Sequence, residues 1–486
     1  MFDYSAFARR KLTAITPKYL PFADVATDDV PLSRLLRLSL FQITVGMALV
    51  LMVGTLNRVM IVELSVPATL VAGMLALPLL FAPFRTVIGF KSDVHVSALG
   101  LRRMPYIWKG TLYQFGGFAI MPFALLVLSG YGESYDAPLW WGYGSAGLSF
   151  LMVGAGMHMV QTVGLALATD LVAEEDQPKV VGLMYVMLLF GMVLSALVFG
   201  ALLENYSPGR LIQVIQGTAV ITAGLNLLAM WQQEPRDRNR ARAMKEMRPQ
   251  RFSDAWGSLI RQPGMIRLLV VIGLGTFGFG MADVLLEPYG GQVLGLSVAS
   301  TTKLTALFAA GTLIGFGIAS RVLGQGALPA RYAIIGAGIG LPGFGAIILS
   351  SSIVGVPLFL LGTFAIGVGT GLFGHATLTA SIRAAPRNQI GMALGAWGAV
   401  QATAAGLGIA LAGIVRDLIV GLQPFAGNGP QTPYNFVFSL EILFLAVALT
   451  VMVPFLKGRT RARIISDTNP HRMDRSEPNA EPMEVS

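Results

Sequence analysis

Cysteine is absent from this 486-residue chain, and charged residues make up only 13% of it. The absence of cysteine excludes structural disulfides, thiolate-bound zinc, cysteine-ligated iron–sulfur clusters and thiol nucleophiles. The hydrophobic fraction is 54% and the mean hydropathy is +0.65, so the chain is more apolar than soluble globular proteins. We therefore expect an integral membrane protein.

Twelve continuous apolar runs are long enough to cross a membrane, since a spanning helix needs about 20 apolar residues. Membrane β-barrels have instead alternating segments of about ten residues. The sequence thus predicts an all-α membrane protein with twelve transmembrane helices. The predicted spans lie near residues 36–56, 68–88, 106–128, 142–166, 180–202, 211–231, 265–286, 302–324, 330–350, 353–375, 390–414 and 436–456.

The lysines and arginines are distributed unequally between the two sides of the predicted spans. When residues near the ends of the spans are counted with the adjacent segment, 31 of the 35 belong to the N-terminal segment, the even-numbered loops and the C-terminal tail, and four belong to odd-numbered loops. Cytoplasmic loops carry an excess of Lys and Arg. The distribution predicts that both termini are cytoplasmic.

The spans divide the chain into two halves of six helices. We expect a cytoplasmic N-terminal segment over residues 1–35, an N-terminal half over 36–231, a cytoplasmic basic linker over 232–264, a C-terminal half over 265–456 and a cytoplasmic tail over 457–486. The arginines of the linker are interpreted as topogenic and as contacts to anionic lipid headgroups rather than to nucleic acid.

Internal similarity supports two related halves. LSVPATLVAGMLALP from Leu64 resembles LSVASTTKLTALFAA from Leu296, and GLALATDLVAEEDQPKVVGLM from Gly164 resembles GHATLTASIRAAPRNQIGMAL from Gly374. Because each half has an even number of spans, the two halves have the same orientation in the membrane and are related by an axis along its normal. This is the layout of the major facilitator superfamily.

The loop between the second and third spans contains GFKSDVHVSALGLRRMPYIW, which resembles the cytoplasmic signature of that superfamily. Gly89, Asp93, Arg102 and Arg103 match it, whereas Val94 takes the place of the usual arginine. The implied role is a conformational lock, in which guanidinium or backbone donors hold a carboxylate across the domain interface. The alternative is a loop that only sets the topology.

Four longer blocks resemble one branch of the superfamily: PLSRLLRLSLFQITVGMALVLMVGTLNRVMIVEL, ALPLLFAPFRTVIGFKSD, RRMPYIWKGTLYQFGGFAIMPFALLVLSG and GMADVLLEPYGGQVLGLS. They are similar to the PucC/LhaA family of purple phototrophic bacteria, over residues 20–456. The resemblance implies assembly of light-harvesting antenna complexes in the bacterial photosynthetic cytoplasmic membrane. The implied partners are bacteriochlorophyll and the antenna polypeptides, with pigment-synthesis enzymes and the reaction-centre core as further candidates.

Bacteriochlorophyll needs an axial ligand on its magnesium, commonly a neutral imidazole. Of the four histidines, His471 lies in the charged tail and His95 in a loop, which leaves His158 and His375 in the fourth and tenth spans. In the superfamily fold both spans line the central cavity. Gln161, one turn beyond His158, is a weaker candidate to orient that ring or to supply an oxygen ligand. The alternative for all three is a hydrogen bond between helices.

The seventh span contains two acids, Asp283 and Glu287, which share one helix face. Carboxylates inside a membrane are costly unless they are paired or hydrated. The two residues are candidates for a proton-coupling site or for a polar contact to cargo. The alternative is an interfacial cap before the turn predicted at 288–291.

The sequence lacks a phosphate-binding loop, HExxH and G-x-S-x-G, so we expect a protein that is not an enzyme. Three functions remain open. They are an assembly factor that delivers bacteriochlorophyll, a proton-coupled transporter of a small solute, and a pigment-free chaperone of antenna helices. Few buried charges and many Gly, Phe and Met residues favour a bulky apolar cargo over a polar solute.

Overall fold

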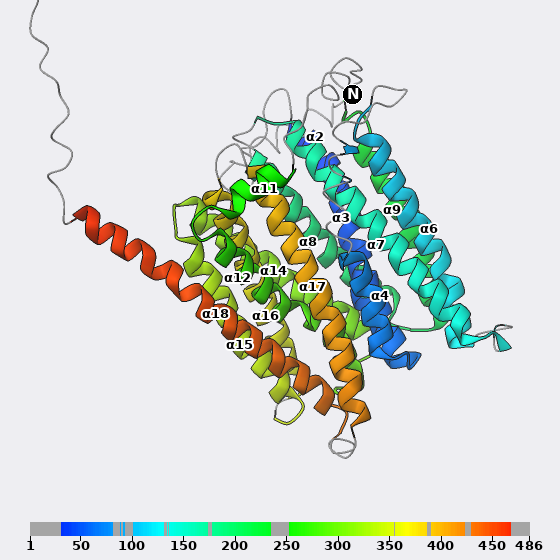
Figure 1. Ribbon diagram of the computed structural model, residues 1–486. Coiled ribbons are helices and arrows are strands. Elements are labelled where there is room, and N and C mark those ends of the chain that lie inside the picture. The colour runs from blue at the N-terminus through cyan, green and yellow to red at the C-terminus, as the bar shows by residue number, and fades with distance from the viewer. Residues whose placement is uncertain are drawn as a thin grey trace, which may run out of the picture.

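The structure is a computed structural model in which all regular secondary structure of the described residues is helical, which confirms the all-α prediction (Figure 1). Within the described residues, eleven helices are long and apolar enough to cross a membrane, and a shorter apolar helix, Ala68–Leu79, lies at the predicted second span. The structure describes residues 31–80, 101–130, 136–173, 177–234, 252–353, 355–385, 390–422 and 429–467, together with residues 88, 91, 92 and 134.

The N-terminal half begins with a span that continues beyond its predicted end at residue 56. Two π-helical segments, η2 and η3, extend it to Glu63, so that Arg58 lies in the helix rather than in a loop. π-helical turns are rare and often occur at functional sites. The elements of this half are α2 (Leu32–Leu38), α3 (Leu40–Leu49), η2 (Val50–Leu56), η3 (Val59–Glu63), α4 (Ala68–Leu80), α6 (Met104–Ser129), α7 (Leu139–Asp170), α8 (Gln177–Leu202) and α9 (Pro208–Met230).

The C-terminal half differs from the prediction in two places. The predicted linker contains a short helix, α11, and the seventh span is divided at Met281, whose backbone angles remain helical, into α12 and α13. The elements of this half are α11 (Phe252–Ile260), α12 (Met265–Gly280), α13 (Ala282–Gln292), α14 (Val298–Gly324), α15 (Pro329–Ser350), α16 (Val356–Ala384), α17 (Ile390–Gly421) and α18 (Thr432–Asp467).

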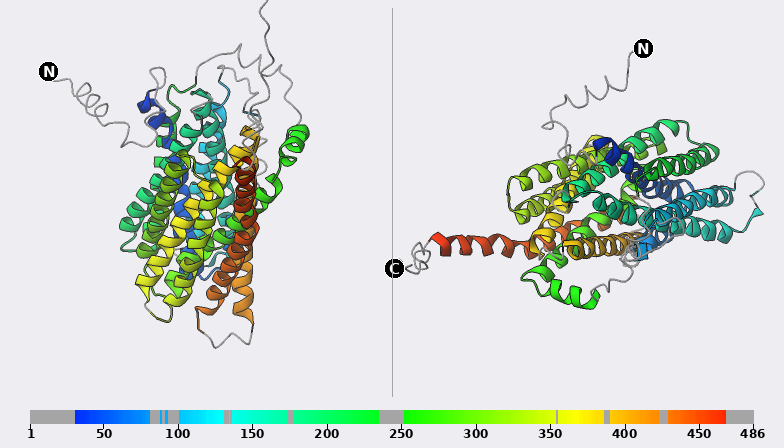
Figure 2. Two further views of the ribbon diagram at one scale, coloured as in Figure 1. Left: turned by 90° about the vertical axis from the view of Figure 1, so that its left-hand side faces the viewer. Right: turned by 90° about the horizontal axis from the view of Figure 1, so that it is seen from above.

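The two halves lie side by side, as the views from the side and from above show (Figures 1 and 2). They meet where α4 packs on α17 and where α8 packs on α14. Small residues allow this close packing: a Cβ on Gly413 would lie 2.4 Å from the Cβ of Ala72, and a Cβ on Gly200 would lie 2.5 Å from the Cγ of Lys303.

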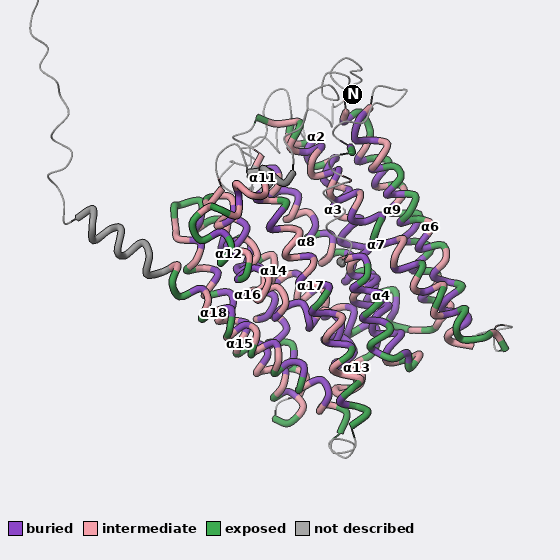
Figure 3. The backbone as a smooth tube through the Cα atoms, in the orientation of Figure 1, coloured by how far each residue is buried: buried purple, intermediate pink, exposed green. Residues whose placement is uncertain are grey.

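The helices alternate in direction, so the bundle has two distinct ends. We call the end at which α2 begins, uppermost in Figure 1, the α2 end. The end at which α4 begins is the opposite end. Exposed residues lie along the outer faces of the helices (Figure 3), and many of them are large and apolar, as expected for surfaces that contact lipid. On α6 these include Trp108, Leu112, Tyr113, Phe115 and Phe123.

Candidate functional site

The first span is hydrogen-bonded to the C-terminal half near the opposite end. The hydroxyl oxygens of Thr55 and Thr302 lie 3.2 Å apart, and Asn57 donates its side-chain amide to the carbonyl of Val284 at 2.9 Å. All four residues are buried. Buried polar groups that are paired in this way hold helices in a specific arrangement, so these bonds fasten the first span to α13 and α14.

Arg58 extends this connection. It is 3% exposed, forms an ion pair with Glu63, and donates to the carbonyl of Leu296 at 3.0 Å. A Cβ on Gly291 would lie 3.0 Å from the guanidinium, so the glycine leaves room for the arginine. Nearby, burial raises the pKa of Tyr206 to about 12, and the negative charge of Glu63 adds to the increase.

A second connection between the halves joins α4 to α17 at the same end. The Thr69 backbone amide donates to Asp417 at 2.7 Å, and its hydroxyl donates to the carbonyl of Gly413 at 3.3 Å. Arg416 donates to Asp417 at 2.8 Å and to the side chain of Gln292 at 2.9 Å. At the opposite end, hydrogen bonds therefore join the two halves in two places, between the first span and α13 and α14 and between α4 and α17.

The two acids of the seventh span have different surroundings, although they occupy one helix face as predicted. Glu287 is 4% exposed and accepts a hydrogen bond from the hydroxyl of Thr305. A Cβ on Gly54 of the first span would lie 2.6 Å from its Oε1. Asp283 instead lies within electrostatic range of Glu441 on α18. Glu287 thus belongs to the interface between the halves, whereas Asp283 is only half-buried.

Glu441 was not among the candidates from the sequence. It is fully buried, with 0% of its surface exposed. The available signal was its position inside the last apolar run, since an ionisable residue in a span is a functional candidate by default. Unlike Asp283 and Glu287, Glu441 has no second acid close to it in the sequence. The acid nearest to it by electrostatic interaction, Asp283, lies on another helix.

The two candidate histidines lie in different halves. His158 is buried in α7, and Gln161 follows it on the same helix and is also buried. His375 lies in α16 with its ring centroid 4.2 Å from that of Phe316 on α14, and Phe316 in turn lies 6.3 Å from Tyr185 on α8. His375 is therefore close to the packing of α8 on α14, where the halves meet. Ligation of magnesium by either histidine stays a prediction.

An apolar groove runs between α12, α17 and α18, with a volume of about 580 Å³. Small-molecule sites commonly have volumes of roughly 300–1,000 Å³. Val270 also lines a second hollow of about 530 Å³, in which Arg267 and Gln262 supply polar groups. The two hollows adjoin at Val270, and Arg267 places a cation in the second one. The first is lined by Val270, Gly273, Leu274, Phe277, Ala399, Val400, Thr403, Ala404, Leu407 and Phe444.

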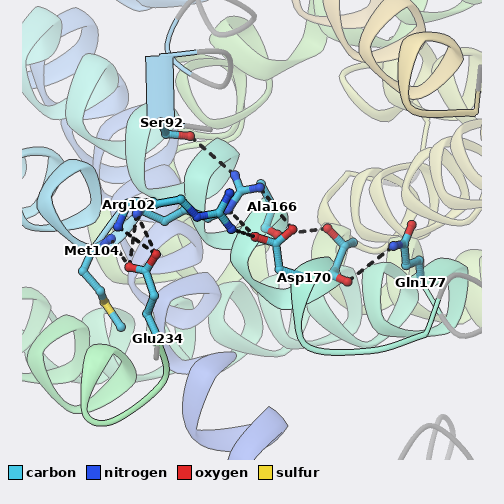
Figure 4. A network of polar contacts seen from close by, with 9 residues as sticks. Ser92, Arg102, Met104, Ala166, Asp170, Gln177 and Glu234 are labelled. Carbon is cyan, nitrogen blue, oxygen red and sulfur yellow. Dashed lines mark hydrogen bonds and ion pairs between the residues drawn. The ribbon is translucent and has the colours of Figure 1, made fainter. Parts of the chain in front are cut away.

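A network of charged residues lies at the α2 end (Figure 4). Arg103 forms a two-pronged pair with Asp170, at 2.6 and 3.2 Å, and Arg102 contacts the same carboxylate at 3.1 Å. Glu234 accepts the backbone amides of Arg102, Arg103 and Met104 at 2.9 to 3.1 Å. A carboxylate thus caps the N-terminus of α6, where the helix dipole favours negative charge.

Asp170 ends α7 and Glu234 follows shortly after α9, so these contacts of the arginines do not reach the C-terminal half. The other two lock candidates, Gly89 and Asp93, lie outside the described residues. A lock across the domain interface therefore stays a prediction. The partners Asp170 and Glu234 were missed in the sequence because they follow the arginines by more than 60 and 130 residues.

The arrangement of helices is similar to that of solved membrane transporters. A bacterial homologue of the human lysosomal transporter Spinster, in an inward-facing conformation, superposes with a TM-score of 0.63 at 16% identity, covering 89% of this chain and 97% of that one. A D-xylose-proton symporter superposes with a TM-score of 0.61 at 15% identity, covering 87% and 97%. At these identities the similarity shows the fold alone, which the chain shares with these membrane transporters.

The sequence relatives are far more similar. The chain is 70% identical to "Protein PucC" of Rhodobacter capsulatus, over 93% of this chain and 99% of the relative. It is 58% identical to "Protein PucC" of Cereibacter sphaeroides over 93% and 98%, and 27% identical to the "Bacteriochlorophyll synthase 44.5 kDa chain" of Rhodobacter capsulatus over 89% and 97%. The family model described as PUCC protein matches residues 55–460. The chain belongs to the PucC family.

Proposed function

We propose that this protein is an assembly factor for bacterial light-harvesting antenna complexes, which binds bacteriochlorophyll and delivers it to the antenna polypeptides, shepherds those polypeptides in the membrane, or does both. The observation that carries the proposal is 70% identity to a PucC protein along nearly the whole chain. The proposed location is the cytoplasmic or intracytoplasmic photosynthetic membrane. The antenna polypeptides are the main proposed partners, and pigment-synthesis enzymes, the reaction-centre core and anionic lipids are further ones.

The proposed topology has twelve spans with both termini in the cytoplasm. Support for the second span comes from α4, whose 13 described residues cover about 20 Å of the roughly 30 Å that a bilayer requires. Support for the orientation comes from the excess of lysine and arginine in the segments at the α2 end. In this topology the α2 end faces the cytoplasm.

The groove between α12, α17 and α18 is the proposed surface for the apolar tail of the pigment. Its lining is apolar apart from the hydroxyl of Thr403. A hydrocarbon chain bound there would therefore cover few polar groups of the protein. A groove formed by outer helices can receive a lipid-soluble pigment sideways from the bilayer. Delivery by this route needs no passage across the membrane.

His158 and His375 are the proposed ligands of the pigment magnesium. For His375 the surroundings suit that role: its Nδ1 is buried with no hydrogen-bond partner among the described residues, and an aromatic ring lies beside it. Neutral imidazole is a common metal ligand. Gln161 is proposed as a positioning residue for His158, one turn along α7.

The experiment is to purify the protein gently from a phototrophic host and to measure bacteriochlorophyll per chain by extraction and absorption. We expect stoichiometric pigment in the native protein and less than half of it in His158→Ala and in His375→Ala. Thr379→Ala is the matched control on α16, since its hydroxyl bonds only the carbonyl of His375 among the described residues, at 2.9 Å. This variant should retain its pigment.

Full pigment occupancy in both histidine variants would exclude ligation by these residues. Pigment-free protein that copurifies with antenna polypeptides would support the chaperone function instead. Protein that binds neither, but drives proton-dependent solute uptake in proteoliposomes, would support the transporter. Glu287, buried beside Thr305 in the seventh span, is the residue that such a transporter would be expected to use.

A further inference from the structure

Glu441 on α18 is a buried acid without a compensating partner. It has 0% exposure, and neither of its carboxylate oxygens has a hydrogen-bond partner among the described residues. The Ala282 backbone amide lies near the carboxylate, outside hydrogen-bond geometry. An ionised carboxylate in such a place would lose its hydration without receiving hydrogen bonds in return, which is expensive.

Asp283 lies within electrostatic range of Glu441. It occupies the first turn of α13, directly after the break at Met281. The backbones are close here, because a Cβ on Gly278 of α12 would lie 3.1 Å from the side chain of Leu445 and 3.3 Å from the carbonyl of Glu441. The seventh span therefore packs against α18 beside Glu441, and the half-buried Asp283 on that span lies close enough to interact electrostatically with the Glu441 carboxylate.

The other charged groups on the helices around α18 are engaged elsewhere or lie at helix ends. Arg416 on α17 bonds Asp417 and Gln292 at the opposite end. Glu287 on α13 accepts from Thr305. The remaining cations lie near the α2 end, with Arg267 in the first turn of α12 and Arg331 in the first turn of α15.

Two ionised carboxylates within electrostatic range of each other in a medium of low dielectric repel, and binding of a proton by one of them removes the repulsion. A bound metal ion would do the same, but calcium takes six to eight oxygen ligands. Among the described residues no group of three or more His, Cys, Asp or Glu side chains could hold a metal ion. The surroundings therefore favour a proton.

We propose that Asp283 and Glu441 form a proton-binding site inside the C-terminal half, at the break between α12 and α13. The bound proton keeps the pair from carrying two negative charges and lets α13 pack against α18. Loss of the proton creates repulsion at the break and loosens this packing. The site goes beyond the proposed role in antenna assembly and does not depend on it.

The test is infrared spectroscopy of the full-length protein, produced in a non-phototrophic host so that no pigment carbonyl contributes. We expect a carbonyl stretch of protonated carboxyl groups at neutral pH that decreases as the pH is raised. Glu441→Gln should remove the Glu441 contribution to this band, and Asp283→Asn should weaken or shift it. The control is Glu204→Gln, whose exposed carboxylate pairs with Lys303, and it should leave the band unchanged.

Identical spectra of the native protein and Glu441→Gln throughout the titration would overturn the proposal. A band that appears only when sodium is removed would overturn it in favour of a cation site. Should Glu441→Gln fail to fold, Asp283→Asn must still show a band that titrates differently from that of the native protein. None of these measurements involves pigment. The proton-binding site could therefore be disproved while the assembly function stands, and the reverse is also true.

A second measurement follows from linkage. The folded state holds a proton that the exposed carboxylates of the unfolded state release, so folding stability must fall as the pH rises from acidic to neutral. The native protein should therefore lose thermal stability over this interval. Glu441→Gln, which is neutral at every pH, should lose less. Equal pH dependence in both proteins would contradict the proposal.

Discussion

The two ends of the molecule are held together in different ways. At the opposite end, hydrogen bonds such as Thr55 to Thr302 and Thr69 to Asp417 join one half to the other. At the α2 end, the pair of Arg103 with Asp170 joins helices of a single half. The halves could separate at the α2 end without breaking that pair, whereas separation at the opposite end breaks several buried bonds. The first kind of contact sets how the halves meet, and the second stabilises one half.

The largest expected effect comes from a covalent bond across the opposite end. The hydroxyl oxygens of Thr55 and Thr302 lie 3.2 Å apart, so cysteine side chains at these positions would approach each other, as disulfide formation requires. The chain has no other cysteine to compete. The oxidised T55C/T302C protein should be more stable than the reduced one by about 2–4 kcal/mol, which thermal unfolding with and without reductant measures.

The same variant distinguishes the candidate functions. Delivery from the side of the membrane does not require the opposite end to open, so we expect antenna assembly to continue in a strain carrying the oxidised protein. An alternating transporter would stop. The single variants T55C and T302C are the controls, and failure of the pair to cross-link, measured by thiol labelling, would show that the halves do not meet as described.

A smaller effect is expected from the α2 end. Asp170→Asn removes the negative charge that pairs with Arg102 and Arg103, whose side chains are 10% and 7% exposed. Loss of a fully buried pair costs about 3–5 kcal/mol. Because the Asp170 side chain is 30% exposed, solvent screening reduces the expected loss to about 2 kcal/mol.

Thermal unfolding measures this loss, with Glu204→Gln as the control because its pair with Lys303 is exposed on both sides. The control should change stability by less than about 1 kcal/mol. Asp170→Asn should leave cross-linking between T55C and T302C unchanged. A reduced yield of the cross-link would mean that the two ends are coupled, contrary to the comparison above.

The sequence predicted the spans better than the contacts between them. Long apolar runs encode helices locally, and eleven of the twelve predicted runs coincide with helices long enough to span. The first span was predicted to end at residue 56 because Arg58 and Glu63 interrupt its apolar pattern. In the structure their ion pair, together with the bond from Arg58 to Leu296, lets the helix continue.

Contacts between distant segments left no comparable signal. Thr55 and Thr302 are 247 residues apart, and each is unremarkable within its own helix. Asp283 was identified because an acid in an apolar run is costly, but its neighbour Glu441 lies on another helix. The break at Met281 was not predicted either, since the apolar pattern of the seventh span continues through it. One sequence identifies costly residues, and only the packing identifies their partners.

The smallest expected effect tests how tightly the halves pack near the opposite end. A Cβ on Gly413 of α17 would lie 2.4 Å from the Cβ of Ala72 and 2.7 Å from the carbonyl of Ala68, both on α4. Because backbone atoms cannot move aside singly, Gly413→Ala should push α4 from α17 and cost about 1 kcal/mol. Gly398→Ala, on the same helix with nothing within 4 Å of its Cβ, should be neutral or slightly stabilising because alanine favours helix. Equal unfolding temperatures for the two variants would show that α4 and α17 do not pack closely. The connection through Thr69 would then hold the halves together less firmly than the connection through Thr55 and Thr302.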